Sequence, residues 1–264
     1  MLVATLNLWG TSGDWPARRR VLAEGFKALE PDLVAFQEAV RTDDHDQAAD
    51  LLGDGYQFLQ QTEREDDGRG IVIASRWPLG WTREIDLHLT ARTEGFACGT
   101  LIAEVLAPEP VGPLLLANHL PSWQPRFERE RELQAVAAAR AIEELAGDPG
   151  AHRVVVGDFD ADPASASIRF WTGRQSLDDL SVCYRDAWEL RHPGEPGQTF
   201  TPANPLVPVS DWPFQRIDYV LVGCSDHGGP TLDIAGCERI FDQPVDGVYG
   251  SDHFGLVADL RPPG

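Results

Sequence analysis

The sequence predicts a single α/β domain in which helices cover a core of β-strands. Short apolar runs alternate with longer helical patterns from one end of the 264 residues to the other. No internal repeat and no linker long enough to divide two domains interrupts this alternation. A chain of this length buries on the order of 70% of its unfolded surface, so it needs neither a metal nor disulfides to fold. We therefore interpret residues 1–264 as one layered α/β domain.

The first predicted elements are two strands that flank a helix. Leu2–Leu8 has the pattern of a strand. A helix is expected to begin at Asp14 or Trp15, because Pro16 is tolerated in a first turn, and to end at Glu30-Pro31. A buried strand, Leu33–Phe36, follows it. Further strands are expected at Tyr56–Gln60, Gly70–Ser75, Ala97–Leu106 and Leu114–Ala117.

The longest predicted helix occupies the middle of the chain, from about Pro125 to Leu145. The Gly-Asp-Pro-Gly sequence at 147–150 ends it. The elements expected after it are a strand at Arg153–Val156, a helix near Ala164–Trp171, and strands at Ile217–Val222 and Phe254–Leu260. The stretches His192–Gly197 and Thr201–Pro213 are rich in Pro and Gly, so we expect loops there.

The charge balance argues against one class of function. Forty-two acidic residues against 22 basic ones give a formal net charge of −20. Such a chain repels a phosphate backbone, which makes long duplex nucleic acid an unfavoured partner. No apolar run reaches the length of a membrane span, and Met1–Asn7 is a strand pattern rather than a signal peptide. We therefore expect a monomeric cytoplasmic protein.

Polar side chains stand at the ends of the apolar strands in six places. They are Asn7, Gln37-Glu38, Asn118-His119, Gly157-Asp158-Phe159-Asp160, Arg216-Ile217-Asp218-Tyr219 and Ser251-Asp252-His253. Proteins of the α/β class gather ligand-binding groups at strand ends, where the frame is rigid. Carboxylates, amides and imidazoles together suit a hard divalent cation and acid–base chemistry on a phosphate.

In this order, the six blocks resemble the endonuclease/exonuclease/phosphatase superfamily. Its members include exonuclease-III-like and pancreatic-type deoxyribonucleases, sphingomyelinases and inositol polyphosphate phosphatases. The blocks extend from position 7 to position 253, nearly the whole chain. The resemblance implies a four-layer sandwich, with two mixed sheets packed face to face, helices outside and the site at one end of the strands. It also implies a phosphoesterase that depends on Mg²⁺ or Mn²⁺, with one ion or two.

The resemblance assigns a metal site and a phosphate contact. Glu38 looks like the principal metal ligand, and Asp252 looks like a further one. Asn7 would support the metal, either directly or through a hydrogen bond to Glu38. His119 would contact a non-bridging phosphoryl oxygen and stabilise charge there.

The resemblance also assigns acid–base groups. Asp218 and His253 look like the family's Asp–His pair, in which the carboxylate fixes the imidazole tautomer and raises its basicity. The sequence leaves open whether His253 acts as a base or as a cationic phosphate contact. Asp158 would position or deprotonate the attacking water.

Asp160 departs from the family pattern, which has Asn at this position. An Asn amide can donate a hydrogen bond, whereas an ionised Asp can only accept one. Two carboxylates two residues apart also repel each other. We therefore predict that Asp160 is protonated at neutral pH or that it recruits a second metal. Asp160→Asn should be tolerated if the family role holds.

The substrate is less well defined than the reaction. The loops expected to face the site, Arg41–Asp50 and Glu63–Asp67, are mainly acidic. Trp123 and Trp212 could stack on a base or pack on a lipid-like group. Arg126, together with Arg129 and Arg131, could bind substrate, or these arginines could pair with neighbouring glutamates on a solvated helix face.

A small phosphodiester or phosphomonoester fits these features best. A nuclease acting on short or single-stranded ends is the close alternative. A non-catalytic interaction module on the same fold is the second. Inositol phosphatase activity is disfavoured because its sequence signature is not matched, and sphingomyelinase activity because that would be expected in a secreted protein.

Overall fold

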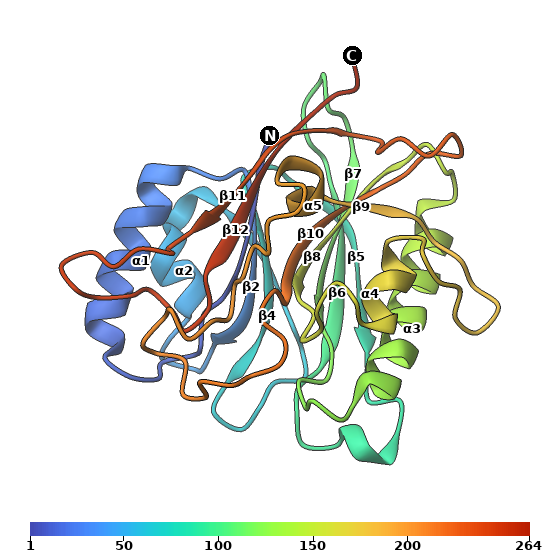
Figure 1. Cartoon of the computed structure of the whole chain (residues 1–264). Helices are drawn as coiled ribbons and strands as arrows, with labels where there is room; N and C mark the ends of the chain where they lie inside the picture. The colour runs from blue at the N-terminus through green and yellow to red at the C-terminus, as the bar shows by residue number, and fades with distance from the viewer.

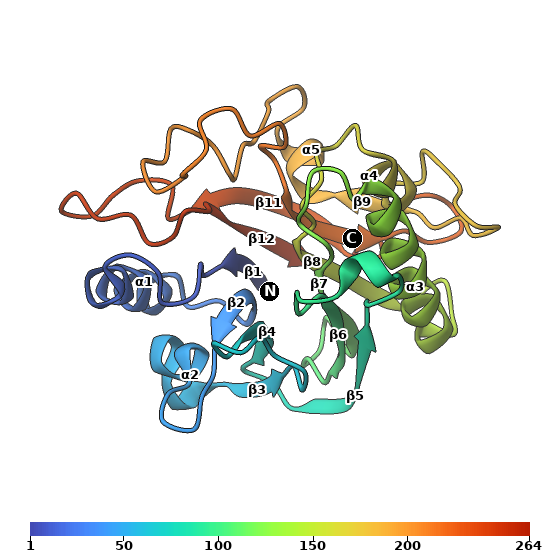
Figure 2. The same ribbon diagram turned by 90° about the horizontal axis from the view of Figure 1, so that it is seen from below.

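Two six-stranded β-sheets pack face to face between two layers of helices in the computed structural model, which describes residues 1–264 (Figures 1 and 2). The first sheet has the order β11-β12-β1-β2-β4-β3. Its strands are β1 (Leu2–Asn7), β2 (Leu33–Val40), β3 (Gln57–Gln60), β4 (Arg69–Ser75), β11 (Asp233–Ile240) and β12 (Gly255–Arg261). Strands β1 and β2 are parallel and the other pairs are antiparallel, so the sheet is mixed.

The second sheet has the order β5-β6-β7-β8-β10-β9. Its strands are β5 (Leu79–Asp86), β6 (Gly99–Val105), β7 (Leu114–Leu120), β8 (His152–Asp158), β9 (Tyr184–Asp186) and β10 (Asp218–Gly223). Only β7 and β8 are parallel. The predicted α/β sandwich of two mixed sheets is therefore confirmed.

Helices cover the outer faces of both sheets (Figure 2). The helices α1 (Trp15–Leu29) and α2 (Gln47–Leu52) pack on the first sheet, and α3 (Glu128–Ala146) and α4 (Ala166–Trp171) pack on the second. The short helix α5 (Ala187–Arg191) contacts β10 and β11, and single 3₁₀ turns lie at Gly53–Gly55 and Ala91–Thr93. The central apolar layer lies between the two sheets and contains aliphatic side chains from both. No helix combines the length and the apolar character that a membrane crossing requires.

The expected start and end of α1 are realised. The Asp14 side chain accepts a hydrogen bond from the backbone N–H of Ala17, which caps the first turn. Pro16 lies within that turn, and Glu30 ends the helix in the left-handed conformation. The buried face of α1 carries Arg18 as well as apolar side chains.

Several elements differ from the sequence-based expectation. Strand β2 continues to Val40 instead of ending at Phe36, and α3 begins at Glu128 rather than Pro125. Strands β5, β9 and β11 and the helices α2 and α5 were not predicted. Strand β5 lies at the edge of its sheet and is mostly exposed, and Arg83 interrupts its alternation of Leu79, Trp81 and Ile85.

The strand directions bring the six polar blocks to one end of the sandwich. Asn7 and Asp158 are the last residues of β1 and β8. Strand β10 runs antiparallel to β8, and its first residue, Asp218, lies directly opposite Asp158. Strand β12 runs antiparallel to β1, so the segment that precedes it, with Asp252 and His253, reaches the same end. Figure 1 shows both chain termini at the opposite end.

Candidate active site

A cavity of about 440 Å³ opens at this end of the sandwich. Its acidic and imidazole lining comes from Glu38, Glu65, Asp158, Asp160, Asp252 and His253. Its apolar lining comes from Trp9, Phe96, Trp123, Phe200, Pro208, Val209, Trp212 and Ile217. Arg69 is its one arginine or lysine, and Gly95 completes the wall. Polar groups that converge on a partly apolar cavity are the usual form of a ligand site.

A β-bulge directs Glu38 toward the cavity. The pairing of β2 with β4 shifts register between Phe36 and Ala39, and Glu38 has φ 51°, in the left-handed region. This conformation is uncommon for a residue other than Gly, Asn or Asp, and such strain tends to persist at functional sites. The Glu38 carboxylate accepts hydrogen bonds from Asn7 Nδ2 (3.1 Å) and Arg69 Nη1 (3.0 Å).

Asn7 joins the two sheets within the site. Its Nδ2 group donates both to Glu38 in the first sheet and to Asp158 Oδ2 in the second, at 2.9 Å. Its Oδ1 atom accepts from the backbone N–H of Trp9, and its carbonyl accepts from Ser251 Oγ at 2.7 Å. Asn7 therefore supports Glu38 through a hydrogen bond, one of the two forms expected from the sequence.

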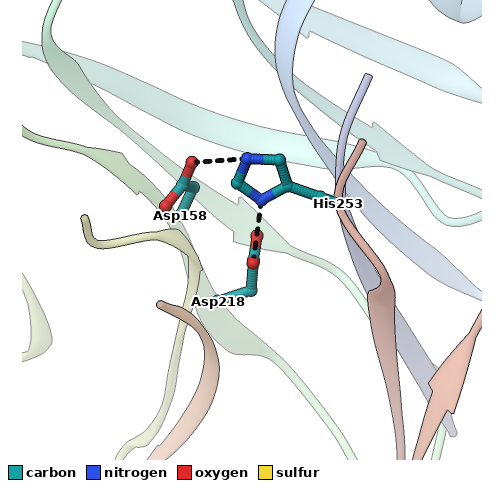
Figure 3. A group of neighbouring side chains, drawn as sticks. All are labelled: Asp158, Asp218 and His253. Carbon is teal, nitrogen blue, oxygen red and sulfur yellow. Dashed lines mark hydrogen bonds and ion pairs between the residues drawn. The ribbon is translucent and has the colours of Figure 1, made fainter. Parts of the chain in front are cut away.

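His253 lies between two aspartates (Figure 3). Its Nδ1 atom is 3.0 Å from Asp218 Oδ2, and its Nε2 atom is 3.8 Å from Asp158 Oδ2. Burial alone would lower the pKa of His253, but the carboxylates of Asp218, Asp158 and Asp252 raise it well above its ordinary value. The imidazole is therefore cationic at neutral pH in this arrangement.

Asp158 and Asp160 are both buried, and burial raises the pKa of each. The pKa of Asp158 lies well above its ordinary value, because desolvation and the charges of Asp160 and Asp218 outweigh the effect of His253. The pKa of Asp160 rises to about 7, chiefly through desolvation. The backbone N–H of Asp160 donates to Asp158 Oδ1 at 3.1 Å, while Asn7 holds the other oxygen. Asp158 is thus fixed in orientation, and burial favours the protonated form of Asp160.

Asp252 is held by neighbouring loops. Its Oδ1 atom lies 3.3 Å from Ser251 Oγ, and burial raises the pKa of Asp252 to about 6. The Asn204 side chain donates to the carbonyls of Ser251 and Asp252 at 2.8 and 3.0 Å. These bonds anchor the segment before β12 to the long loop that follows residue 200.

His119 is buried and does not line the cavity. Its Nδ1 atom is 2.8 Å from Thr100 Oγ1, which faces it from the neighbouring strand β6. Its ring packs against Phe159 and Trp171, with centroids 5.0 and 5.8 Å away. Burial lowers the pKa of His119 to about 3, so the imidazole is neutral. The hydroxyl of Thr100 is the orienting partner that the sequence did not identify.

The two residues expected to bind substrate have different positions. Trp123 lines the cavity with 44% of its surface exposed. Arg126 is exposed before α3 and does not line the cavity. The nearby arginines form the glutamate pairs considered from the sequence, namely Arg129–Glu132 at 3.1 Å and Arg131–Glu128 at 2.8 Å.

Two arginines that were not among the predicted site residues contribute to the site, although the sequence shows Arg69 as a basic residue that flanks a predicted strand. Arg69 forms ion pairs with Glu38, Glu65 and Asp67 at 2.7–3.0 Å. Arg18 is buried and donates to carbonyls on two site loops, including Ser12 at 2.6 Å and Gly250 at 3.0 Å. A sequence signal for Arg18 existed, because its position continues the inward-facing i, i+4 stripe of α1.

The donor set suits a hard divalent cation. Ligand atoms of Asp158, Asp218 and His253 lie within 4.8 Å of one another, but the cationic imidazole pairs with both carboxylates and has no lone pair for a metal. The predicted ligands Glu38 and Asp252 border the same cavity. The charge of Glu38 helps to raise the pKa of Asp160, and the charge of Asp252 helps to raise the pKa of His253. The carboxylates outnumber the nearby cations, and carboxylate oxygens are the ligands that Mg²⁺ and Mn²⁺ prefer.

Comparisons with known proteins agree with this fold. No curated protein sequence matches the chain. Similar solved structures include D. rerio TDP2 complexed with a single-strand DNA product (20% identity, TM-score 0.76, 98% of this chain and 97% of that one). Others are C. elegans TDP2 (19%, 0.78, 98% and 74%) and the human Nocturnin catalytic domain with bound sulfate (20%, 0.75, 100% and 94%). These identities support the shared fold alone.

The family follows from the sequence itself. Residues 4–253 match the sequence model of the Endonuclease/Exonuclease/phosphatase family, a span that contains every residue of the site described above. The order of the polar blocks, the two-sheet sandwich and this match agree. The chain belongs to the Endonuclease/Exonuclease/phosphatase family.

Proposed function

We propose that this chain is a divalent-metal-dependent phosphoesterase that hydrolyses a phosphodiester or phosphomonoester. The observation that carries the proposal is the Asp158–His253–Asp218 arrangement at the cavity, in which one imidazole lies between two buried carboxylates. Such an arrangement provides a proton acceptor beside a cationic donor, the two groups that water attack on a phosphate requires.

Asp158 is the group that would position the attacking water. Hydrogen bonds from Asn7 and from the backbone of Asp160 hold its two oxygens, so its orientation is fixed before substrate arrives. His253, oriented by Asp218, presents Nε2 on the side of Asp158 and would contact a phosphoryl oxygen. His119 remains proposed as a neutral donor to the phosphate, held by Thr100.

Asn7, Glu38 and Asp252 are the residues proposed to hold the metal. A bound divalent cation would polarise the phosphoryl group and offset the charge of the surrounding carboxylates. Asn7 and Arg69 orient the Glu38 carboxylate through its two oxygens. Metal binding therefore has a second expected readout, a rise in thermal stability that depends on Glu38.

The test is hydrolysis of bis-p-nitrophenyl phosphate with Mg²⁺ or Mn²⁺. We expect activity that EDTA abolishes, and a loss of at least about 100-fold in Glu38→Gln and in His253→Asn. Matched controls are Glu144→Gln and His227→Asn, whose side chains are exposed outside the cavity and should leave activity unchanged. Full activity in Glu38→Gln and His253→Asn would contradict the mechanism, and no hydrolysis of any phosphoester would favour the interaction-module reading.

Cleavage of single-stranded nucleic-acid ends is the second candidate. The observation that favours it is the similarity to TDP2, which was solved with a single-strand DNA product. The cavity of this chain, however, has one arginine, and three carboxylates already pair with it. Short oligonucleotides compared with small diesters at two salt concentrations would decide, because strand binding weakens steeply with salt.

A further inference from the structure

Aromatic side chains from separate loops meet around the catalytic groups. They are Trp9, Phe96, Trp123, Phe200 and Trp212. The Phe200 ring lies 4.9 Å from the His253 ring and 6.0 Å from the Trp212 ring, the latter in an edge-to-face arrangement. The aromatic surface is therefore continuous with the imidazole proposed to contact the reacting phosphate.

Two of these tryptophans are in unfavourable positions, one exposed to solvent and one with a strained backbone. Trp123 leaves 44% of its large apolar surface exposed at the cavity. Trp9 has φ 55°, a left-handed conformation that bulky residues rarely adopt, and its indole stacks on the guanidinium of Arg18 at 5.0 Å. Strained or exposed aromatic groups beside a catalytic site are typical of ligand contacts.

The cavity offers no free cation for a second phosphate. Arg69 is paired with Glu38, Glu65 and Asp67. The adjoining groove, which shares Arg69 and Phe96 with the cavity, is lined by acidic residues. They are Glu63, Glu65, Asp66 and Asp67. Arg64 in this groove donates to the carbonyls of Ala39 and Gly68, both at 2.7 Å, so it is also engaged.

We propose that the substrate carries a single phosphate group attached to one planar aromatic group, which stacks on the aromatic wall formed by Trp123, Phe200 and Trp212. This inference rests on the proposed phosphoesterase function and narrows its substrate class to aryl-type or mononucleoside-type phosphoesters. Stacking is sequence-tolerant and strong for flat rings, whereas the acidic groove repels any further phosphate. An acyl chain has no planar ring to stack on this wall, and a polyphosphate would be repelled by the acidic groove.

The test is calorimetric titration of the Mn²⁺-loaded protein with phosphonates, whose P–C bond is not hydrolysed. We expect phenylphosphonate to bind about tenfold more tightly than methylphosphonate or cyclohexylphosphonate. Adding a second phosphonate to the same ring, as in 1,4-phenylenediphosphonate, should weaken binding. Equal affinity for the phenyl and cyclohexyl ligands would show that general apolar contact, and not aromatic stacking, binds the ring. Tighter binding of the diphosphonate would contradict the claim that the substrate carries a single phosphate.

Two alanine variants compare the effect on ligand affinity of a tryptophan in the aromatic wall with that of a surface tryptophan. Trp123→Ala should reduce the ratio of phenyl to methyl affinity about tenfold. Trp81→Ala is the matched control, because Trp81 is 37% exposed on β5 and lies outside the cavity, and it should retain the wild-type ratio. A Trp123→Ala variant with an unchanged ratio would contradict the proposal. If the protein binds phenylphosphonate selectively but hydrolyses no phosphoester, the proposed phosphoesterase function is wrong and the inference about the bound ligand still holds.

Discussion

Asp160 is the residue at which this chain departs from its family, and the local structure accommodates the change. Its φ of 50° lies in the left-handed region, which Asn and Asp tolerate better than most residues. The backbone therefore accepts either side chain, and the difference is one of charge. Burial, opposed in part by Arg131 and His253, raises the pKa of Asp160 to about 7. A site that disfavours the ionised form allows the carboxyl group to act as a donor, as an Asn amide would.

We predict that Asp160→Asn stabilises the metal-free protein in a pH-dependent manner. The folded pKa of about 7 lies above the unfolded value of about 3.9, so the folded state favours the protonated acid. The wild type therefore loses stability as pH rises through this interval, and the variant does not. The gain in unfolding free energy should be near zero at pH 4 and reach about 4 kcal/mol above pH 7, because each pKa unit corresponds to about 1.4 kcal/mol.

Urea unfolding in EDTA at several pH values measures this gain. Asp226→Asn, an exposed position, serves as the control and should show no such dependence. Added Mn²⁺ should reduce the gain, because a cation favours the ionised form of Asp160. A stability gain that is equal at pH 4 and pH 8 would show that the folded protein does not raise the pKa of Asp160.

At the scale of elements, two local irregularities place the site residues. The bulge in β2 turns Glu38 toward the cavity, and a close approach of β7 and β8 sets the position of His119. Gly157 has φ 145° and lies opposite His119, where a Cβ atom would come within 2.1 Å of the His119 carbonyl oxygen. A residue with a side chain cannot occupy this position without separating the two strands.

Gly157→Ala should therefore destabilise the protein and displace His119. We expect a loss of about 3 kcal/mol in unfolding free energy, measured by urea denaturation, since overpacking and backbone strain act together. The environment of Trp171, which contacts His119, should change in near-ultraviolet circular dichroism. Gly55→Ala is the control, because a Cβ atom at position 55 would meet no other atom within 4 Å and the backbone there is not left-handed. A loss below about 0.5 kcal/mol at position 157 would contradict the close approach.

At the scale of the whole molecule, the pattern of apolar runs predicted a layered α/β domain with polar strand ends, and the family resemblance predicted the two sheets and the site at one end. Strand periodicity and polar strand ends depend on local sequence, so both are visible in it. Pairing register is not local, which is why the contact between Thr100 and His119 could not be found. The bulge at Glu38 and the ion pairs of Arg69 also depend on the neighbouring strand.

A buried polar connection between the sheets also depends on this long-range arrangement. Asn118 in β7 donates to the carbonyls of Phe36 and Val72 in the opposite sheet, at 2.8 and 2.9 Å. Its Oδ1 atom accepts from Gln37 Nε2 at 2.7 Å. The register shift that begins at Phe36 interrupts the ladder between β2 and β4 there, and Asn118 binds carbonyls on both of these strands.

Asn118→Leu should consequently weaken the joint between the two sheets. The substitution keeps a similar side-chain volume but removes the side-chain donor to two buried carbonyls and one acceptor of Gln37 Nε2, so we expect a loss of about 3 kcal/mol in unfolding free energy. Urea denaturation measures the loss, and Gln243→Leu at an exposed position should change stability by less than about 0.5 kcal/mol. Because Asn118 stands directly beside His119 and Gln37 beside Glu38, activity should fall along with stability. A stable Asn118→Leu variant would mean that water or a neighbouring side chain satisfies the two carbonyls, and that Asn118 does not hold the sheets together.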